Sequence, residues 1–330
     1  MIRHAAMRDI SLCRRIRAWG APLLFLKILR CVLSGIAAGS FSVTPLDFVE
    51  FFAGQQAVSN AMKDAALVAA VFELKLDPIG QNMLSDLGFA NAVNLCLNLK
   101  PGAGCLMAPV CSTWTFMNRG TSKRSLACPY GNAAVQSVQE GNTMVARCVL
   151  LLLLLASRGC WWVLEQPQGS LMQEHPALQH LMSVMTVYRH CIQMCHYGAS
   201  SKKRTWLYSN ARWICDVDLY KTCIQPRCPT QLVTTSINKA GKVTTTGNAD
   251  LKASQHYPVG FGRAICNIYM DHCGQLKETA GAVMNMDIKW LNSVPSEPWQ
   301  EANLKPVLQF MRGSCQGARK MAGQIGWRGC

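Results

Sequence analysis

Two short apolar segments of the chain each end at a side chain that can take part in covalent catalysis. The run 104–108 is followed by Pro109, Val110 and Cys111, and the run 161–164 leads directly into Glu165. Open α/β enzymes keep their reacting groups at the carboxyl ends of strands. A thiol and a carboxylate at two such ends predict a nucleophile and an acid/base partner over one site. The alternative for Cys111 is a buried cysteine without chemistry, one of 17 in the chain.

A third strand end carries a glycine turn. Phe52 ends the predicted strand 47–52, and Ala53, Gly54 and Gln55 follow it and precede a helical pattern. Glycine lets the backbone approach a ligand closely at such a turn.

Two carboxylates lie further along the chain from this turn. Glu73 and Asp77 stand near the end of the next apolar run, about 20 residues on, a spacing that suits a carboxylate on the ribose of a nucleoside cofactor. A solvated strand end explains the two acids equally well when they are taken alone.

A basic segment precedes the last expected strand of the sheet. Lys202, Lys203 and Arg204 are three adjacent cations that could contact a phosphate or a base edge. A basic turn on the protein surface explains these three residues equally well. His190, Cys191, Cys195 and His196 lie nearby with poor ligand spacing, so no metal site is predicted.

The order of apolar runs and turn residues predicts alternating strands and helices. Such alternation argues for a mostly parallel sheet with helices on both faces. The segment 112–131 is expected as a polar loop, and 210–257 as a small insertion with hairpin character. The expected strands are 47–52, 67–74, the segment ending at Pro109, 161–165, 193–197 and 205–208; the expected helices are 57–62, 87–99, 133–157, 176–191 and one after 257–261.

Four regions follow from this pattern. Residues 1–44 form a basic extension, 45–210 a catalytic domain, 211–256 an insertion that suits target recognition, and 257–330 a returning helix with a tail. The extension has the character of a transit peptide or an interfacial amphipathic helix, and both interpretations stay open. Its charged residues are Arg3, Arg8, Arg14, Arg15, Arg17, Lys27 and Arg30 against Asp9.

Composition limits the classes of protein. Half of the residues are apolar and 15% are charged, which excludes a disordered chain. The balance of 33 Lys and Arg against 18 Asp and Glu gives a formal charge of +15 and favours a polyanion as partner. The Leu-rich run 148–156 is far shorter than the ~20 residues that span a bilayer, so it predicts a buried helix and no required membrane partner. Most cysteines lie inside apolar runs and are expected to be reduced and buried.

The order of these motifs resembles the DNA cytosine-carbon-5 methyltransferases. The resemblance rests on Phe-Ala-Gly at 52–54, Pro-x-Cys at 109–111, Glu165 and Tyr-Gly-x-x-x-x-Lys at 197–203, and it covers about residues 45–210. A weaker match lies at 251–258. The resemblance implies the Rossmann-like class I methyltransferase fold, a mostly parallel seven-stranded sheet with helices on both faces, and S-adenosylmethionine (SAM) as cofactor.

The resemblance also implies roles for individual residues. Cys111 would attack carbon 6 of a flipped-out cytosine, and Glu165 would contact ring nitrogen 3. Lys203, Ser112 and Thr113 would contact the substrate, which is DNA, with RNA as the less favoured choice. The residues implied to hold SAM are Phe52, Ala53, Gly54, Gln55, Glu73, Asp77 and Pro109.

Two further hypotheses stay open. The first is a non-catalytic nucleic-acid-binding or scaffold protein on the same fold. The formal charge of +15 supports it, and so do Val110 and Gln56, because the family usually has Pro and Gly at these two places. The second is a methyltransferase for an exocyclic amino group, for which Cys111 would be incidental.

Overall fold

The structure is a computed structural model that describes residues 45–272 except 225–229, 238, 240 and 242. The predicted basic extension 1–44 and the part of the last region beyond 272 therefore lie outside the described residues.

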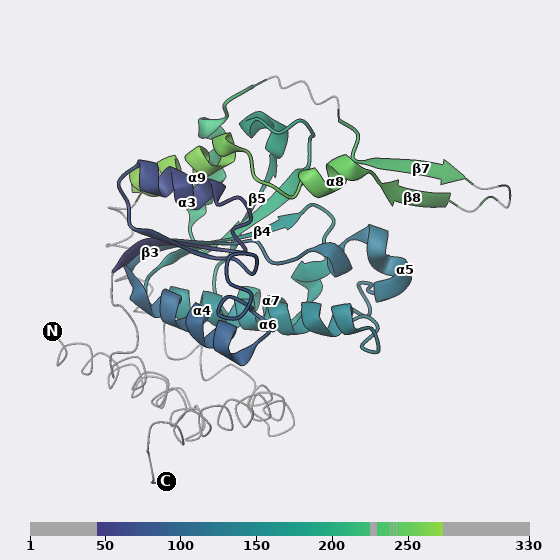
Figure 1. Cartoon of the computed structure of the whole chain (residues 1–330), viewed down its shortest axis with the longest axis horizontal. Helices are drawn as coiled ribbons and strands as arrows, with labels where there is room; N and C mark the ends of the chain where they lie inside the picture. Colours follow the sequence, from purple (N-terminus) through teal and green to yellow (C-terminus); the bar gives the residue numbers. More distant parts are fainter. Residues whose placement is uncertain (1–44, 225–229, 238, 240, 242, 273–330) are drawn as a thin grey trace, which may run out of the picture.

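A six-stranded sheet forms the centre of the described chain (Figure 1). Its order is β2-β1-β3-β4-β6-β5, in which β6 is antiparallel to both of its neighbours while β1 to β4 are parallel. The prediction of a mostly parallel sheet is confirmed, but the described residues supply six of the seven expected strands. The strands are β1 (Leu46–Phe51), β2 (Ala69–Phe72), β3 (Leu99–Met107), β4 (Trp161–Pro167), β5 (Tyr188–Gln193) and β6 (Arg204–Ser209).

Helices cover both faces of the sheet, as the alternating pattern predicts. One face packs against α4 (Asp86–Asn98), α6 (Gln136–Ser157) and α7 (Pro176–Val184), and the other against α3 (Ala57–Asp64) and α9 (Val259–His272). Central strands alternate between the two cores, so Phe51 faces the first and Phe48 the second. Full burial of such a side chain is worth about 1.5–3 kcal/mol.

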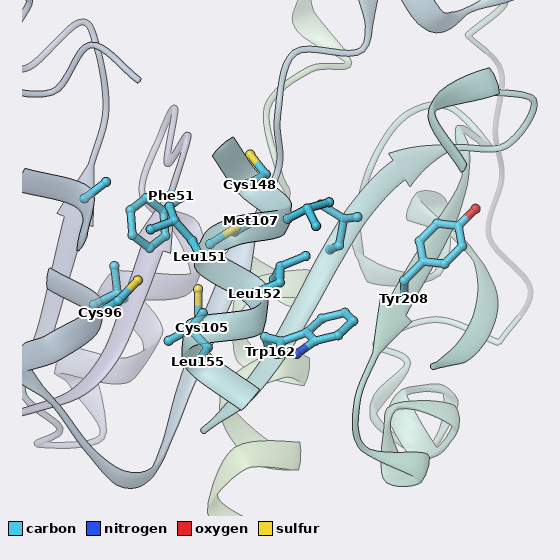
Figure 2. Packing of buried hydrophobic residues seen from close by; sticks show 14 of the residues in the cluster. Phe51, Cys96, Cys105, Met107, Cys148, Leu151, Leu152, Leu155, Trp162 and Tyr208 are labelled. Atoms are coloured by element: carbon cyan, nitrogen blue, oxygen red, sulfur yellow. The ribbon is translucent and has the colours of Figure 1, made fainter. Parts of the chain in front are cut away.

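The first core is built around the apolar face of α6 (Figure 2). Leu151, Leu152 and Leu155 contact the sheet beside Trp162, together with buried thiols such as Cys105. Burial raises the pKa of these thiols, which keeps them protonated and apolar. By length and composition α6 could span a membrane, but its buried face belongs to this core.

The polypeptide between α7 and β6 differs from the expectation. The helix expected at 176–191 ends at Val184, and β5 occupies 188–193. The segment 193–197, expected as a strand, is largely a 3₁₀ helix at Met194–Tyr197, which ends at Gly198. β5 is an edge strand with one fully buried residue, Ile192, so its period-two pattern is weak in the sequence.

The segment after β6 contains a 3₁₀ helix (Arg212–Tyr220) and the expected hairpin, formed by β7 (Val233–Ile237) and β8 (Val243–Gly247). The hairpin projects from the body of the molecule and is followed by α8 (Ala249–Ala253) (Figure 1).

Glycines allow α9 to lie directly against α3. A Cβ atom on Gly262 would stand 2.1 Å from the carbonyl oxygen of Ala57. One on Gly260 would stand 2.3 Å from the carbonyl oxygen of Tyr197. Both distances are far below van der Waals contact, so α9 requires glycine at 262 to lie against α3 and glycine at 260 to lie against the 3₁₀ helix Met194–Tyr197. The close approach fixes the start of α9 beside the carboxyl edge of the sheet.

Arg124 holds together the segment that follows β3. This segment, expected as a polar loop, contains two 3₁₀ turns and the short helix α5 (Arg119–Ser122). The Arg124 guanidinium donates to the carbonyl oxygen of Pro129 at 2.6 Å, to Asn142 Oδ1 at 2.8 Å and to the carbonyl oxygen of Val138 at 3.1 Å. Its central carbon lies 3.3 Å from the Trp114 ring centroid. Burial lowers the pKa of Arg124 to about 10, so the side chain remains a cation at neutral pH.

His175 closes this cluster from the side of α7. Its ring packs edge-on against Trp114 and Tyr130, and its Nδ1 accepts from the backbone N–H of Ala177, which caps the helix. Burial, with the charge of Arg124 as a second cause, lowers the pKa of His175 to about 4. His175 is therefore neutral at neutral pH.

Replacing Gly262 by Ala tests the α3–α9 seam. We expect Gly262→Ala to lower the free energy of unfolding by about 2 kcal/mol, because the added methyl group overlaps the Ala57 carbonyl. Denaturant unfolding measures the change. Gly120→Ala is the matched control, since a Cβ there meets no atom within 4 Å. Equal stability of the two variants would contradict the seam.

Replacing Arg124 by Lys tests the cluster behind β3. Lys keeps the charge but lacks the planar guanidinium, so the carbonyl oxygens of Pro129 and Val138 lose their donor. We expect the free energy of unfolding to fall by about 2–4 kcal/mol. Denaturant unfolding gives the value, and limited proteolysis should cut the segment after β3 earlier. Arg119→Lys, at an exposed position of α5, should leave both unchanged. A stable, protease-resistant Arg124→Lys protein would contradict the assigned role.

Candidate functional site

The end of β3 delivers Cys111 to the carboxyl edge of the sheet. β3 ends at Met107, Pro109 is buried, and Cys111 is half-buried at the start of the first 3₁₀ turn. The Gln166 side chain donates to the carbonyl oxygen of Pro109 at 2.8 Å. Ser170 Oγ donates in turn to Gln166 Oε1 at 3.0 Å. The end of β4 thus fixes the backbone just before Cys111.

Glu165 lies in β4 and is only 5% exposed. Lys203 Nζ lies 3.7 Å from Glu165 Oε1, which has no hydrogen-bond partner among the described residues. Burial is the main cause that raises the pKa of Cys111; the negative charge of Glu165 raises it further and Lys203 opposes it. The structure therefore brings Cys111, Glu165 and Lys203 together from three strand ends.

Tyr257 is a residue of this site that the sequence pattern did not reveal. It precedes α9, and Lys203 Nζ lies 5.6 Å from the centroid of its ring. Burial is the main cause that raises the pKa of Tyr257 well above its usual value, and the negative charge of Glu165 raises it further. Spacing could not have found Tyr257, because it enters the site through packing of α9.

The turn after β1 has an unusual backbone. Phe52, Gly54 and Gln56 have φ values of 59°, 51° and 59°, in the left-handed region. The backbone N–H of Gly54 donates to Glu73 Oε2 at 2.9 Å, and that of Lys75 donates to Glu73 Oε1 at 3.1 Å. The buried carboxylate of Glu73 therefore closes the turn from β2.

A second buried carboxylate holds the other side of the same turn. Glu50, fully buried at the end of β1, accepts from the backbone N–H of Ser59 at 2.7 Å and from its hydroxyl. It thereby caps the first turn of α3, which has no side-chain cap of its own. Burial raises the pKa of Glu50, and the hydrogen bonds from Ser59 oppose that shift.

The other residues predicted for cofactor binding make fewer contacts with the turn after β1 than Glu73 does. Ala53 is buried, whereas Gly54 and Gln55 are exposed, and a Cβ on Gly54 would meet no atom within 4 Å among the residues that the structure describes. Asp77 is exposed and accepts from the backbone N–H groups of Ile79 and Gly80 at 3.2 Å and 2.8 Å. Glu73 thus reaches the glycine turn, while Asp77 shapes its own loop.

Ser112 and Thr113, predicted to contact substrate, point to different surroundings. Ser112 is exposed beside Cys111, and its carbonyl oxygen accepts from the Asn118 amide. The Thr113 hydroxyl accepts from Arg124 at 3.4 Å and so belongs to the Arg124 cluster.

The described residues contain no cluster of His, Cys, Asp or Glu that suits a metal ion. His190 pairs with Asp218 at 3.2 Å, and His196 Nδ1 lies 2.8 Å from the carbonyl oxygen of Cys223.

A cavity of about 250 Å³ lies along the seam of α3 and α9. Gln55 and Tyr257 both line it, whereas Cys111 and Glu165 do not, so it lies beside the thiol and carboxylate rather than over them. Its remaining lining residues are Ala57, Asn60, Ala61, Asp64, Val259 and Arg263.

No protein-family model matches the chain, and no curated protein matches it. Among solved structures, it is similar to the crystal structure of S. pombe Dnmt2 methyltransferase at 13% identity and a TM-score of 0.31. The match covers 56% of this chain and 57% of that one, so this chain spans little more than half of its length.

Proposed function

We propose that the protein is a SAM-dependent methyltransferase that methylates carbon 5 of cytosine in DNA, with RNA as the less favoured substrate. The observation that carries the proposal is the meeting of Cys111, Glu165 and Lys203 at one edge of the sheet, where Glu165 Oε1 accepts no hydrogen bond from the described part of the chain. A thiol needs a neighbouring base to lose its proton, and a cytosine needs a proton at nitrogen 3 to accept a nucleophile at carbon 6. One carboxylate between the two can serve both needs.

In this proposal Cys111 and Glu165 make the covalent bond and carry the protons. Cys111 Sγ bonds to carbon 6 of the flipped-out base while its proton passes to the Glu165 carboxylate. Glu165 delivers a proton to ring nitrogen 3, where negative charge would otherwise build up. Lys203, beside Oε1, favours the return of Glu165 to its anionic form. After methylation the carbon-5 proton leaves to solvent, the Sγ–carbon 6 bond breaks and the proton on nitrogen 3 returns to the sulfur.

The turn after β1 fits a nucleoside cofactor in its chemistry. A Cβ on Gly54 would meet no atom of the described residues within 4 Å, and each oxygen of Glu73 accepts one backbone N–H and retains a lone pair for a ribose hydroxyl. Phe52, Ala53 and Gln55 would hold SAM with them, beside Pro109 at the neighbouring strand end. When bound, SAM supplies an electrophilic methyl group for carbon 5.

A non-catalytic nucleic-acid-binding protein is the second candidate. Two observations favour it: burial raises the pKa of Cys111, which disfavours the thiolate, and Glu73 is already bound to the backbone of the turn. Covalent trapping and titration with SAM separate the methyltransferase from the non-catalytic protein.

Covalent trapping tests the nucleophile. We expect duplex DNA that contains 5-fluorocytosine to form a stable adduct with the wild type in the presence of SAM, because fluorine at carbon 5 cannot leave as a proton. Cys111→Ser should abolish the adduct and retain SAM and DNA binding, and Glu165→Gln should slow its formation by about 100-fold or more. Denaturing gel electrophoresis measures the adduct. Cys128→Ser, at an exposed cysteine of the same segment, is the control. Trapping that survives Cys111→Ser would overturn the assignment.

Calorimetric titration with SAM tests the cofactor turn. Gly54→Asp should weaken binding by at least tenfold, since it puts a second carboxylate beside Glu73 in the space left open over the turn. Gly169→Asp is matched, because Gly169 also has a positive φ and a Cβ there meets nothing within 4 Å. Wild-type protein that binds no SAM at millimolar concentration would favour the non-catalytic candidate.

A further inference from the structure

The hairpin of β7 and β8 stands apart from both cores of the molecule. Figure 1 shows it projecting beyond α8, on the side of the molecule where α5 lies. Within the described residues the two strands pair only with each other, and most of their side chains are exposed. A two-stranded hairpin buries too little apolar surface to be stable in isolation. The hairpin therefore depends on its anchoring and offers its length to a partner.

The base of the hairpin is anchored beside the candidate site. The Asn248 side-chain amide donates to the carbonyl oxygen of Gln231 at 2.6 Å and so joins the two ends of the hairpin. The backbone N–H of Thr230 donates to the carbonyl oxygen of Ser200 at 3.4 Å. Ser200 belongs to the segment that leads to Lys203. The hairpin thus leaves the body of the protein next to the segment that brings a cation to Glu165.

The two faces of the hairpin carry different side chains. Residues that pair directly across two antiparallel strands point to the same face, and so do residues two apart along one strand. This register gathers four exposed hydroxyl side chains on one face, called the hydroxyl face: Thr234, Ser236, Thr244 and Thr246.

The opposite face carries apolar side chains and one further pair of hydroxyls. Thr235 Oγ1 and Thr245 Oγ1 lie 3.3 Å apart and form a hydrogen bond with each other. The four side chains of the hydroxyl face have no side-chain hydrogen bond to any residue that the structure describes. Their donors are therefore available to a ligand.

The chemistry of the hairpin suits a phosphate backbone. Residues 230–248 include Lys239 and Lys242 and no Asp or Glu, so the hairpin attracts a polyanion. Ser and Thr hydroxyls donate to phosphate oxygens. The two strands consist of Thr, Ser, Val, Ile and Gly, and so carry none of the Arg, Asn or Gln side chains that read a base edge through two hydrogen bonds.

We propose that the hydroxyl face binds the phosphate backbone of duplex DNA beside the target cytosine and holds the duplex without reading its sequence. The choice of duplex DNA as partner rests on the proposed function, whereas the contact itself does not require the covalent step. The hairpin then positions the substrate, which differs from the target recognition that the sequence suggests for the region 211–256.

Binding of short fluorescent DNA duplexes to the full chain, measured by anisotropy at one fixed salt concentration, tests the hydroxyl face. Thr234→Val combined with Thr246→Val removes a cross-strand pair of hydroxyls and keeps the branched shape that strands favour. We expect the dissociation constant to rise about tenfold, because each hydroxyl donates to a charged phosphate oxygen. The rise should be equal for duplexes of different sequence around one cytosine, since every sequence carries the same phosphates.

Thr235→Val combined with Thr245→Val is the matched control, because it removes an equal pair of hydroxyls from the opposite face. Its dissociation constant should equal that of the wild type. Unchanged binding by the Thr234→Val and Thr246→Val protein, or an equal loss in the control, would overturn the contact. A loss that varies with the duplex sequence would reveal base reading and would overturn it as well.

The same duplexes separate this contact from the proposed function. A wild type that binds them and loses affinity in the hydroxyl-face variant, yet forms no adduct with 5-fluorocytosine DNA in the presence of SAM, would overturn the methyltransferase and leave the contact standing. A wild type that binds no duplex would overturn both.

Discussion

Strand β6 runs against its neighbours, and this reversal sets the composition of the site. In a parallel sheet the carboxyl ends of the strands share one edge, where β1, β3 and β4 deliver the Gly54 turn, Cys111 and Glu165. β6 contributes its amino end to the same edge, because Leu207 pairs with Glu165 and Thr205 with Pro167 in antiparallel register. Lys203 therefore lies next to Glu165. A parallel β6 would carry Lys203 to the opposite edge and leave Glu165 buried without a cation.

Three buried carboxylates at the strand ends differ in what surrounds them. Glu73 binds backbone N–H groups through both oxygens and closes the turn after β1. Glu50 caps α3, and its raised pKa means that it takes up a proton more readily, which relieves the cost of burying a charge. Glu165 lies beside a lysine and near a thiol, and its Oε1 accepts no hydrogen bond from the described residues. Glu73 and Glu50 stabilise the backbone around them, whereas the surroundings of Glu165 suit a group that exchanges protons.

The sequence predicts the strand ends well and the packing between them poorly. Cys111 and Glu165 follow dense apolar runs that only buried strands explain, so their place at one edge follows from parallel topology. Strand β5 is missed because its edge position leaves a weak period-two pattern, and the helical pattern of 176–191 extends over it. Arg124 and Tyr257 are missed for another reason. Their positions depend on a carbonyl cluster, a ring stack and a glycine seam, which join residues far apart in the chain and have no fixed spacing.

The central claim is that one thiol among 17 cysteines is the nucleophile. Tandem mass spectrometry of the protease-digested adduct between the wild-type protein and 5-fluorocytosine DNA identifies the modified residue directly. The account predicts that the nucleotide mass is carried by the peptide that contains Cys111. A nucleotide on any other cysteine, or no modified peptide from protein that binds both SAM and DNA, would contradict it.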